Sequence, residues 1–292
     1  MFILVLLTLC VLPTIANAES LFQDPTGEDF YDKISSYKTE DISCLPDCNE
    51  DNYEKKYIRA VLSLSGGNER LNIKESCNDS VNSLKKMWEA GLNDAGYNLS
   101  RMYYEGVCGE VNLSRSEDLL FKTAENGYVP AQKLLGKSYW RQEIQNKIFD
   151  QDLDQAAHWL KKSAEGGDGE SAAMIASFYR RGISFEEDPQ LSYYWIDKAF
   201  SAEYGGGPGA YSLRLADYYE NGYGTNKDLV KSYFFYDLSG TAGLEGKSRI
   251  SKDMTEVEIQ EAIKQSRAWQ EEHNTFVPSY YGLEHQSDGS YR

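Results

Sequence analysis

The sequence predicts an all-α protein built from repeated pairs of helices. Two features of its 292 residues support this prediction. First, four helical segments place a tyrosine at one shared position, and these tyrosines recur every 36 to 40 residues: Tyr103, Tyr139, Tyr179 and Tyr219. Second, each segment is followed by another helical segment that ends at a glycine or an equivalent residue. A period of this length, with two helices in each repeat, is typical of an α-solenoid.

The first helix of each repeat carries the same packing positions. These helices are expected at Ala95–Gly106, Ala131–Gln142, Ser171–Gly182 and Tyr211–Gly222. Four residues before each tyrosine stands a large aliphatic residue: Leu99, Leu135, Ile175 or Leu215. The next residue is small: Ser100, Gly136, Ala176 or Ala216. A large side chain, a small one and an aromatic ring on one helical face predict a buried helix–helix contact.

The second helices are marked by their start signals and by one aromatic position. They are expected at Ser116–Asn126, Leu153–Gly166, Pro189–Glu203 and Lys227–Ala242. The first begins at a Ser, and the other three follow Asp152, Asp188 and Asn226; these residue types accept hydrogen bonds from the first backbone N–H groups of a helix. Trp159, Trp195 and Phe235 share one position in these helices and are expected in the core.

Residues 1–18 have the pattern of an export signal. Phe2–Leu12 is an apolar run, and Ala16 and Ala18 are small residues at the −3 and −1 positions of a cleavage site. The run is too short to cross a membrane as a helix. The sequence therefore predicts a cleaved signal and a periplasmic or secreted protein.

The helical pattern divides the rest of the chain into consecutive segments. Residues 19–51 form a polar leader with one short helix at Glu28–Tyr37, and residues 52–91 form a degenerate first repeat with helices at Asn52–Leu64 and Ser80–Ala90. Full repeats are expected at residues 92–128, 129–168, 169–205 and 206–243. A helix at residues 254–273, with Val257 and Trp269 on its apolar face, is expected to cap the last repeat. Residues 274–292 are expected to be a flexible tail.

Four cysteines remain after signal cleavage, and all lie in the N-terminal third: Cys44, Cys48, Cys77 and Cys108. An even number of cysteines in an exported chain predicts two disulfides, with three possible connectivities. A thiol site or half of a metal site at Cys44 and Cys48 is the alternative.

The spacing within the repeats resembles the Sel1-like repeat family, which is related to the tetratricopeptide repeats. The clearest matches are Ala131, Leu135, Gly136 and Tyr139, followed by Trp159, Lys162, Ala164, Glu165 and Gly167. The sequence departs from the family pattern at Gln142, Phe200 and Gly240. The resemblance implies a right-handed α-solenoid of helix-turn-helix repeats with a C-terminal capping helix. It also implies protein–protein binding, with no catalytic residues to transfer.

Charge and motifs argue against several classes of function. The net charge is −16, so nucleic acid and anionic membranes are repelled. Three scattered histidines and the absence of hydrolase, zinc or phosphate-loop motifs predict a protein that is not an enzyme and holds no metal or cofactor.

The first helices of such a solenoid line its concave side, and their outward positions are the predicted partner-binding surface. The predicted residues are Tyr97, Arg101, Tyr104, Lys133, Lys137, Trp140, Arg141, Arg180, Arg181, Asp217 and Glu220. The middle of this set is basic and aromatic although the whole chain is acidic, and Arg, Tyr and Trp are enriched in binding hot spots. The alternative is a solvated face whose Lys and Arg balance acids on neighbouring helices.

The sequence thus predicts an exported scaffold that clamps a partner protein in its concave groove. One version is an immunity protein that neutralises a toxic lipase effector of the type VI secretion kind. A rival within the class is an envelope or host-interaction adaptor. A rival from another class, a cell-wall or β-lactam hydrolase, would need a nucleophile and a base that the sequence does not provide.

Overall fold

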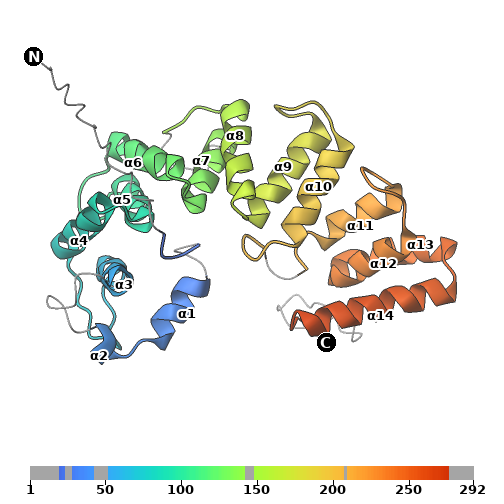
Figure 1. The fold of residues 1–292 in the computed structure, drawn as a ribbon, viewed down its shortest axis with the longest axis horizontal. Coiled ribbons are helices and arrows are strands. Elements are labelled where there is room, and N and C mark those ends of the chain that lie inside the picture. The colour runs from blue at the N-terminus through green and yellow to red at the C-terminus, as the bar shows by residue number, and fades with distance from the viewer. Residues whose placement is uncertain (1–19, 24–27, 43–51, 142–147, 207–208, 276–292) are drawn as a thin grey trace, which may run out of the picture. The chain divides into compact units, whose positions relative to one another are not determined.

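A computed structural model describes residues 20–23, 28–42, 52–141, 148–206 and 209–275. The regular elements of these residues are helices, as predicted (Figure 1). The chain divides into two compact units, residues 1–131 and 132–292. The predicted signal peptide and nearly all of the predicted tail lie outside the described residues.

Unit 1 contains the leader and the first two helix pairs. Its helices are α1 (Glu28–Ser36), α2 (Thr39–Ile42), α3 (Tyr53–Leu64), α4 (Cys77–Glu89), α5 (Asn93–Glu105) and α6 (Leu113–Glu125). The helices α3 to α6 pack successively, each against the next. This arrangement agrees with the helix pairs expected from the sequence, and α2 is an element that the sequence analysis missed.

The leader of unit 1 is part of the core, which its polar composition did not predict. Phe22 is 6% exposed, and its ring packs edge-on against Phe30 at a centroid distance of 5.1 Å. The backbone N–H groups of Leu21 and Phe22 donate to the two carboxylate oxygens of Asp94 at 2.8 and 3.1 Å. Asp94 is fully buried, and the hydroxyl of Tyr128 donates to it as well.

Unit 2 contains the other repeats and the C-terminal helices. Its helices are α7 (Val129–Arg141), which begins in the last residues of unit 1, α8 (Leu153–Glu165), α9 (Gly169–Arg181), α10 (Pro189–Phe200), α11 (Ser212–Asn221), α12 (Leu229–Leu238), α13 (Leu244–Ile250) and α14 (Glu256–Glu272). Consecutive helices from α8 to α12 pack against each other, and α12 also contacts α13 and α14 (Figure 1).

The aliphatic and small positions of the predicted repeat are buried, whereas the shared tyrosine is buried at Tyr179 and Tyr219 and partly buried at Tyr103 and Tyr139. Leu99, Leu135, Ile175 and Leu215 are each at most 1% exposed. The small neighbour allows close approach: a Cβ at Gly136 would lie 2.6 Å from Cγ of Leu160 on α8. The shared aromatic position of the second helices is also buried, at Trp159, Trp195 and Phe235.

Two details of the C-terminal part correct the sequence analysis. The helix expected at Lys227–Ala242 ends at Leu238, because Gly240 adopts a left-handed φ of 61° and starts the 3₁₀ turn Gly240–Gly243. The capping helix α14 packs on α12, and Trp269 contacts the ring of Phe200 at 5.3 Å. Val257, expected to cover the last repeat, is instead 78% exposed because it lies in the first turn of α14 on the solvent side.

Candidate protein-binding surface

Unit 2 brings together the central residues of the predicted surface, on α7, α9 and α11. The ammonium group of Lys133 lies 3.0 Å from Oδ2 of Asp168 and 2.9 Å from Oε2 of Glu170. Lys137 reaches Oε1 of the same glutamate at 2.9 Å. Asp168 is also the N-cap of α9, where its Oδ1 accepts from the backbone N–H of Ser171. These lysines therefore hold α7 to the start of α9.

The pKa values of these groups follow from burial and pairing. Burial lowers the pKa of Lys133, but the charges and hydrogen bonds of Asp168 and Glu170 outweigh it, and the pKa is raised above its ordinary value. Burial raises the pKa of Glu170, and the hydrogen bonds from Lys137 and Lys133 outweigh it, so this pKa is lowered. Lys133 and Glu170 are thus both held in their charged forms.

Arginines make the corresponding contacts between α9 and α11. Nη2 of Arg180 lies 2.9 Å from Oδ2 of Asp217, and its guanidinium lies 5.1 Å from the ring centroid of Tyr218. Nη1 of Arg214 donates to the carbonyl oxygen of Ala173 and to Oγ of Ser177, both at 2.9 Å. Burial lowers the pKa of Arg214 from its ordinary value. The two arginines thus hold α11 to α9, Arg180 from α9 and Arg214 from α11.

Glu220, the last acid in the predicted set, also forms an ion pair within the protein. Nε and Nη2 of Arg249 donate to its two carboxylate oxygens at 2.8 and 2.7 Å. The hydroxyl of Tyr236 donates to the same carboxylate at 2.5 Å. The hydrogen bond from Arg249 is the main reason why the pKa of Glu220 is lowered.

These pairs correct the predicted chemistry of the surface. The charges of Lys133, Lys137 and Arg180 are balanced by acids on neighbouring segments, which is the alternative that the sequence left open. The excess of basic residues in the middle of the set is therefore largely neutralised. Arg181 differs, because it is exposed and makes no ion pair with any residue that the structure describes.

A pocket of about 190 Å³ lies among these helices. Its lining includes Trp140 of α7, Met174 of α9, and Tyr211 and Arg214 at the start of α11. Trp140 is partly buried, and its ring packs edge-on against Phe178 at 5.3 Å. The pocket thus combines an aromatic wall with polar groups that are already oriented by their own hydrogen bonds. Sequence reasoning identified Trp140 but missed Tyr211 and Arg214. In the helical pattern these two residues do not fall at the positions expected to point outward.

The residues predicted in unit 1 have a different environment. Tyr97 is 9% exposed and packs against Tyr128 at 5.7 Å, so its predicted outward position is wrong: the segment before α7 covers it. Arg101 forms an ion pair with Glu105 one turn along α5, at 3.1 Å. Tyr104 is partly exposed on the same helix. Arg141 ends α7, and its side chain lies outside the described part of the structure.

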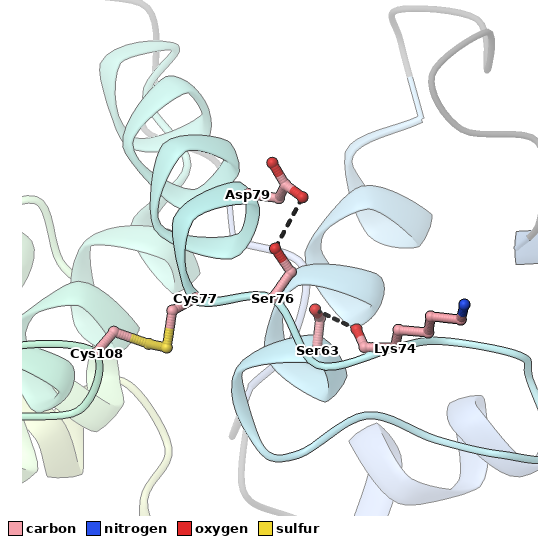
Figure 2. The surroundings of a disulfide bond; sticks show 6 residues. All are labelled: Ser63, Lys74, Ser76, Cys77, Asp79 and Cys108. Carbon is pink, nitrogen blue, oxygen red and sulfur yellow. Dashed lines mark hydrogen bonds between the residues drawn. A yellow bond between two sulfur atoms is a disulfide. The ribbon is translucent and has the colours of Figure 1, made fainter.

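A disulfide in unit 1 joins the first residue of α4 to the loop after α5. Cys77, at the start of α4, is bonded to Cys108, which follows α5, and their Cα atoms lie 5.4 Å apart (Figure 2). The bond links the degenerate first repeat to the next repeat. Cys44 and Cys48 lie outside the described residues.

Other kinds of site are not formed by the described residues. They contain no cluster of three or more His, Cys, Asp or Glu side chains that could hold a metal ion. None of their helices has both the length and the apolar character needed to cross a membrane.

The stacked helix pairs of the two units define the class: an α-solenoid of helix-turn-helix repeats. A family model of the Sel1 repeat matches residues 94–128, 129–168, 169–204 and 212–244. The chain therefore belongs to the Sel1 repeat proteins, which are generally protein-interaction scaffolds. This agrees with the resemblance seen in the sequence.

Solved structures show the same fold. A protective antigen of uropathogenic Escherichia coli with an SLR fold is 22% identical, with a TM-score of 0.55 over 81% of this chain and 49% of that chain. A Sel1 repeat protein from Oxalobacter formigenes is 18% identical, with a TM-score of 0.50 over 74% of this chain and 63% of that chain. An uncharacterised protein of Neisseria meningitidis is 26% identical over 115 residues, which are 39% of this chain and 23% of that protein. The chain thus matches less than two thirds of the length of each of these proteins.

Proposed function

We propose that the chain is an exported scaffold that binds a partner protein on the first-helix face of unit 2, formed by the outward residues of α7, α9 and α11. The observation that supports this proposal is the pocket of about 190 Å³ on that face, with Trp140 in its wall. Arg181, at the end of α9, adds an exposed cation on the helix that lines this pocket. Trp and Arg are the residue types that most often act as anchors in protein interfaces.

The ion pairs within this face define what a partner would find there. Lys133, Lys137 and Arg180 already have acidic partners, so an incoming acidic group would have to compete with Asp168, Glu170 or Asp217 for them. The face is therefore a rigid surface of paired charges around an aromatic pocket. We expect an apolar or aromatic side chain of the partner to fill the pocket beside Trp140, and an acid of the partner to meet Arg181.

The export signal predicted from the sequence and the disulfide support a role outside the reducing cytosol. The bond between Cys77 and Cys108 is of the kind that persists in oxidising compartments. Neutralisation of a lipase effector of the type VI secretion kind and adaptor binding to an envelope or host protein would both use the same face. They differ only in the identity of the bound protein. We propose no catalytic activity.

Site-specific photo-crosslinking tests this proposal in the native host. A photoreactive phenylalanine replaces Arg181 in one strain and Lys161, on the second helix α8, in the control strain. We expect a crosslinked protein that is specific to position 181, and mass spectrometry then identifies it. A toxic lipase among the products supports the immunity role, and an envelope or host protein supports the adaptor role. Crosslinking at position 161 alone contradicts the proposed face.

A further inference from the structure

A second and larger pocket lies in unit 1, between α3 and α4. Its volume is about 740 Å³, which is within the range of roughly 300–1,000 Å³ that holds small ligands. Residues from one face of each helix line it, and nothing in the proposed protein-binding role of unit 2 uses it. Its lining is rich in hydroxyl and amide groups as well as charged ones.

The charged residues that line this pocket are mostly positive, although the net charge of the whole chain is negative. It contains Lys56 and Arg59 of α3, Lys86 of α4 and a single acid, Asp79. Asp79 accepts a hydrogen bond from Oγ of Ser76 at 2.8 Å, beside the disulfide (Figure 2). In a protein whose net charge is −16, three cations around one cavity make a local site for negative charge.

The arginine and the end of α4 add donors to the same site. Arg59 uses Nη1 for one long hydrogen bond, 3.4 Å to the carbonyl oxygen of Ile42, and a guanidinium carries five N–H donors. The pocket reaches the first turn of α4, where Asp79 and Ser80 line it. The side chain of the N-cap residue, Ser76, accepts no hydrogen bond from the backbone N–H groups of the first turn. The first-turn N–H groups thus have no side-chain acceptor at the N-cap, and the positive end of the helix dipole lies at the end of α4 that Asp79 and Ser80 bring to the pocket.

The buried hydroxyl of Ser80 is the independent observation that points to a ligand. Ser80 is 1% exposed and lines the pocket, and its Oγ has no hydrogen-bond partner among the described residues. Buried polar groups in folded proteins nearly always have a partner, because an unmade hydrogen bond is unfavourable. A ligand that accepts this hydrogen bond would supply the partner.

We propose that the pocket between α3 and α4 binds a small organic anion through its carboxylate or phosphate oxygens. Arg59 and Lys86 would meet the oxyanion groups from the two helices, and Ser80 would donate its hydroxyl hydrogen at the floor of the pocket. Carboxylates and phosphates are the acceptors that guanidinium and ammonium groups bind most strongly. The proposal does not depend on the protein partner of unit 2.

Calorimetry and thermal unfolding of the chain from residue 19 onward test this site. The probes are citrate for carboxylate chemistry, glycerol 3-phosphate for phosphate chemistry, and glycerol as the neutral control, all at one ionic strength set with sodium chloride. We expect saturable binding of citrate or glycerol 3-phosphate, a rise in Tm with that anion, and no response to glycerol. Comparison of the two anions shows which oxyanion the pocket prefers.

Three variants connect the binding to the pocket. Lys86→Glu and Ser80→Ala should each weaken the anion about tenfold or more, the loss expected for one charged or buried hydrogen bond. Ser80→Ala should fold at least as stably as the parent without ligand, because the removed hydroxyl has no described partner. Lys85→Glu, the same charge reversal on a residue of α4 outside the pocket, should leave binding unchanged. Absence of saturable binding of both anions, binding that survives either pocket variant, or equal loss in Lys85→Glu would overturn the proposal.

Discussion

The ammonium nitrogen of Lys133 lies 3.0 Å from a carboxylate oxygen of Asp168, which is buried and caps the next first helix. One carboxylate thus connects two consecutive repeats and also accepts a hydrogen bond from a backbone N–H group at the start of α9. The contact explains why a strongly acidic chain places lysines at outward positions of α7. Their main effect is on the stacking of the repeats, and their charge is not available to a partner.

The first prediction follows from this contact. Lys133→Met keeps the length of the side chain but removes its charge, and leaves the carboxylate of Asp168 buried without its cation. We expect a loss of about 3 kcal/mol in the free energy of unfolding, as for other broken buried ion pairs. Chemical denaturation measures it. Lys137→Met is the matched control: its partner Glu170 is 39% exposed, and a loss of less than about 1 kcal/mol is expected. Equal losses in the two variants would contradict a special role for Asp168.

The second prediction concerns the small position of the repeat. In Gly136→Ala the new Cβ would lie 2.6 Å from Cγ and 2.9 Å from the backbone nitrogen of Leu160, so α7 and α8 must move apart. Overpacking of this kind destabilises a protein by about 1–3 kcal/mol. Gly109→Ala provides the comparison, since no atom lies within 4 Å of its added Cβ and its φ is not left-handed. A thermal melt that shows no difference between these variants would argue against the close contact.

The repeats could be predicted from the sequence because each position recurs four times. The position of Leu135 is defined by three other copies and that of Trp159 by two, Trp195 and Phe235, and both residues are buried as expected. The leader could not be predicted in the same way. Leu21 and Phe22 are an isolated apolar pair in a polar stretch after the predicted signal, and the core position of Phe22 depends on Asp94, 72 residues further along the chain.

The candidate surface was predicted only in part, for a related physical reason. A helical pattern shows which residues point outward, but it does not show what the neighbouring repeat places opposite them. Tyr97 is outward on its own helix and is covered by Tyr128. Arg180 is outward on α9 and is paired with Asp217 of α11. Such contacts depend on the stacking geometry, which the repeat period alone does not specify.

The third prediction tests the leader. Phe22→Ala removes a ring that is 6% exposed and packs on Phe30 and Tyr57, and we expect a loss of about 3–5 kcal/mol in unfolding free energy. Tyr31, on α1, is 61% exposed. Tyr31→Ala should therefore change stability by no more than about 0.5 kcal/mol. Deletion of residues 19–23 should destabilise at least as much as Phe22→Ala, because Asp94 also loses the two backbone donors. A truncated chain as stable as the parent would show that the leader is dispensable.

The fourth prediction concerns the disulfide between Cys77 and Cys108. It closes a loop with a sequence separation of 31 residues, for which the chain-entropy model gives about 3–4 kcal/mol of stabilisation. We expect Cys77→Ser with Cys108→Ser to lower the stability by roughly this amount. Peptide mapping of the exported protein without reduction should recover the linked Cys77 and Cys108 peptides. Alkylation of both thiols in freshly isolated native protein would mean that the bond does not form in the cell.

The last prediction separates binding from stability on the first-helix face of unit 2. Arg180 is unsuitable for this test, because its reversal would also break the pair with Asp217 that holds α9 to α11. Arg181→Glu changes an exposed charge, and Trp140→Ala opens the wall of the pocket. Each substitution should weaken the binding of the partner found by crosslinking by about 2 kcal/mol, as expected for an interface anchor.

Calorimetry with the purified partner measures these losses, and circular dichroism monitors the fold of each variant. Arg181→Glu should retain the parent melting temperature, whereas Trp140→Ala also loses the ring contact with Phe178 and should melt earlier. The arginine variant is therefore the decisive one, since a loss of affinity at unchanged stability can only come from the surface. Lys161→Glu, on α8, carries the same charge reversal and should bind normally. If Lys161→Glu lowers the affinity for the partner and Arg181→Glu does not, the partner binds the second helices, and the proposed face is wrong.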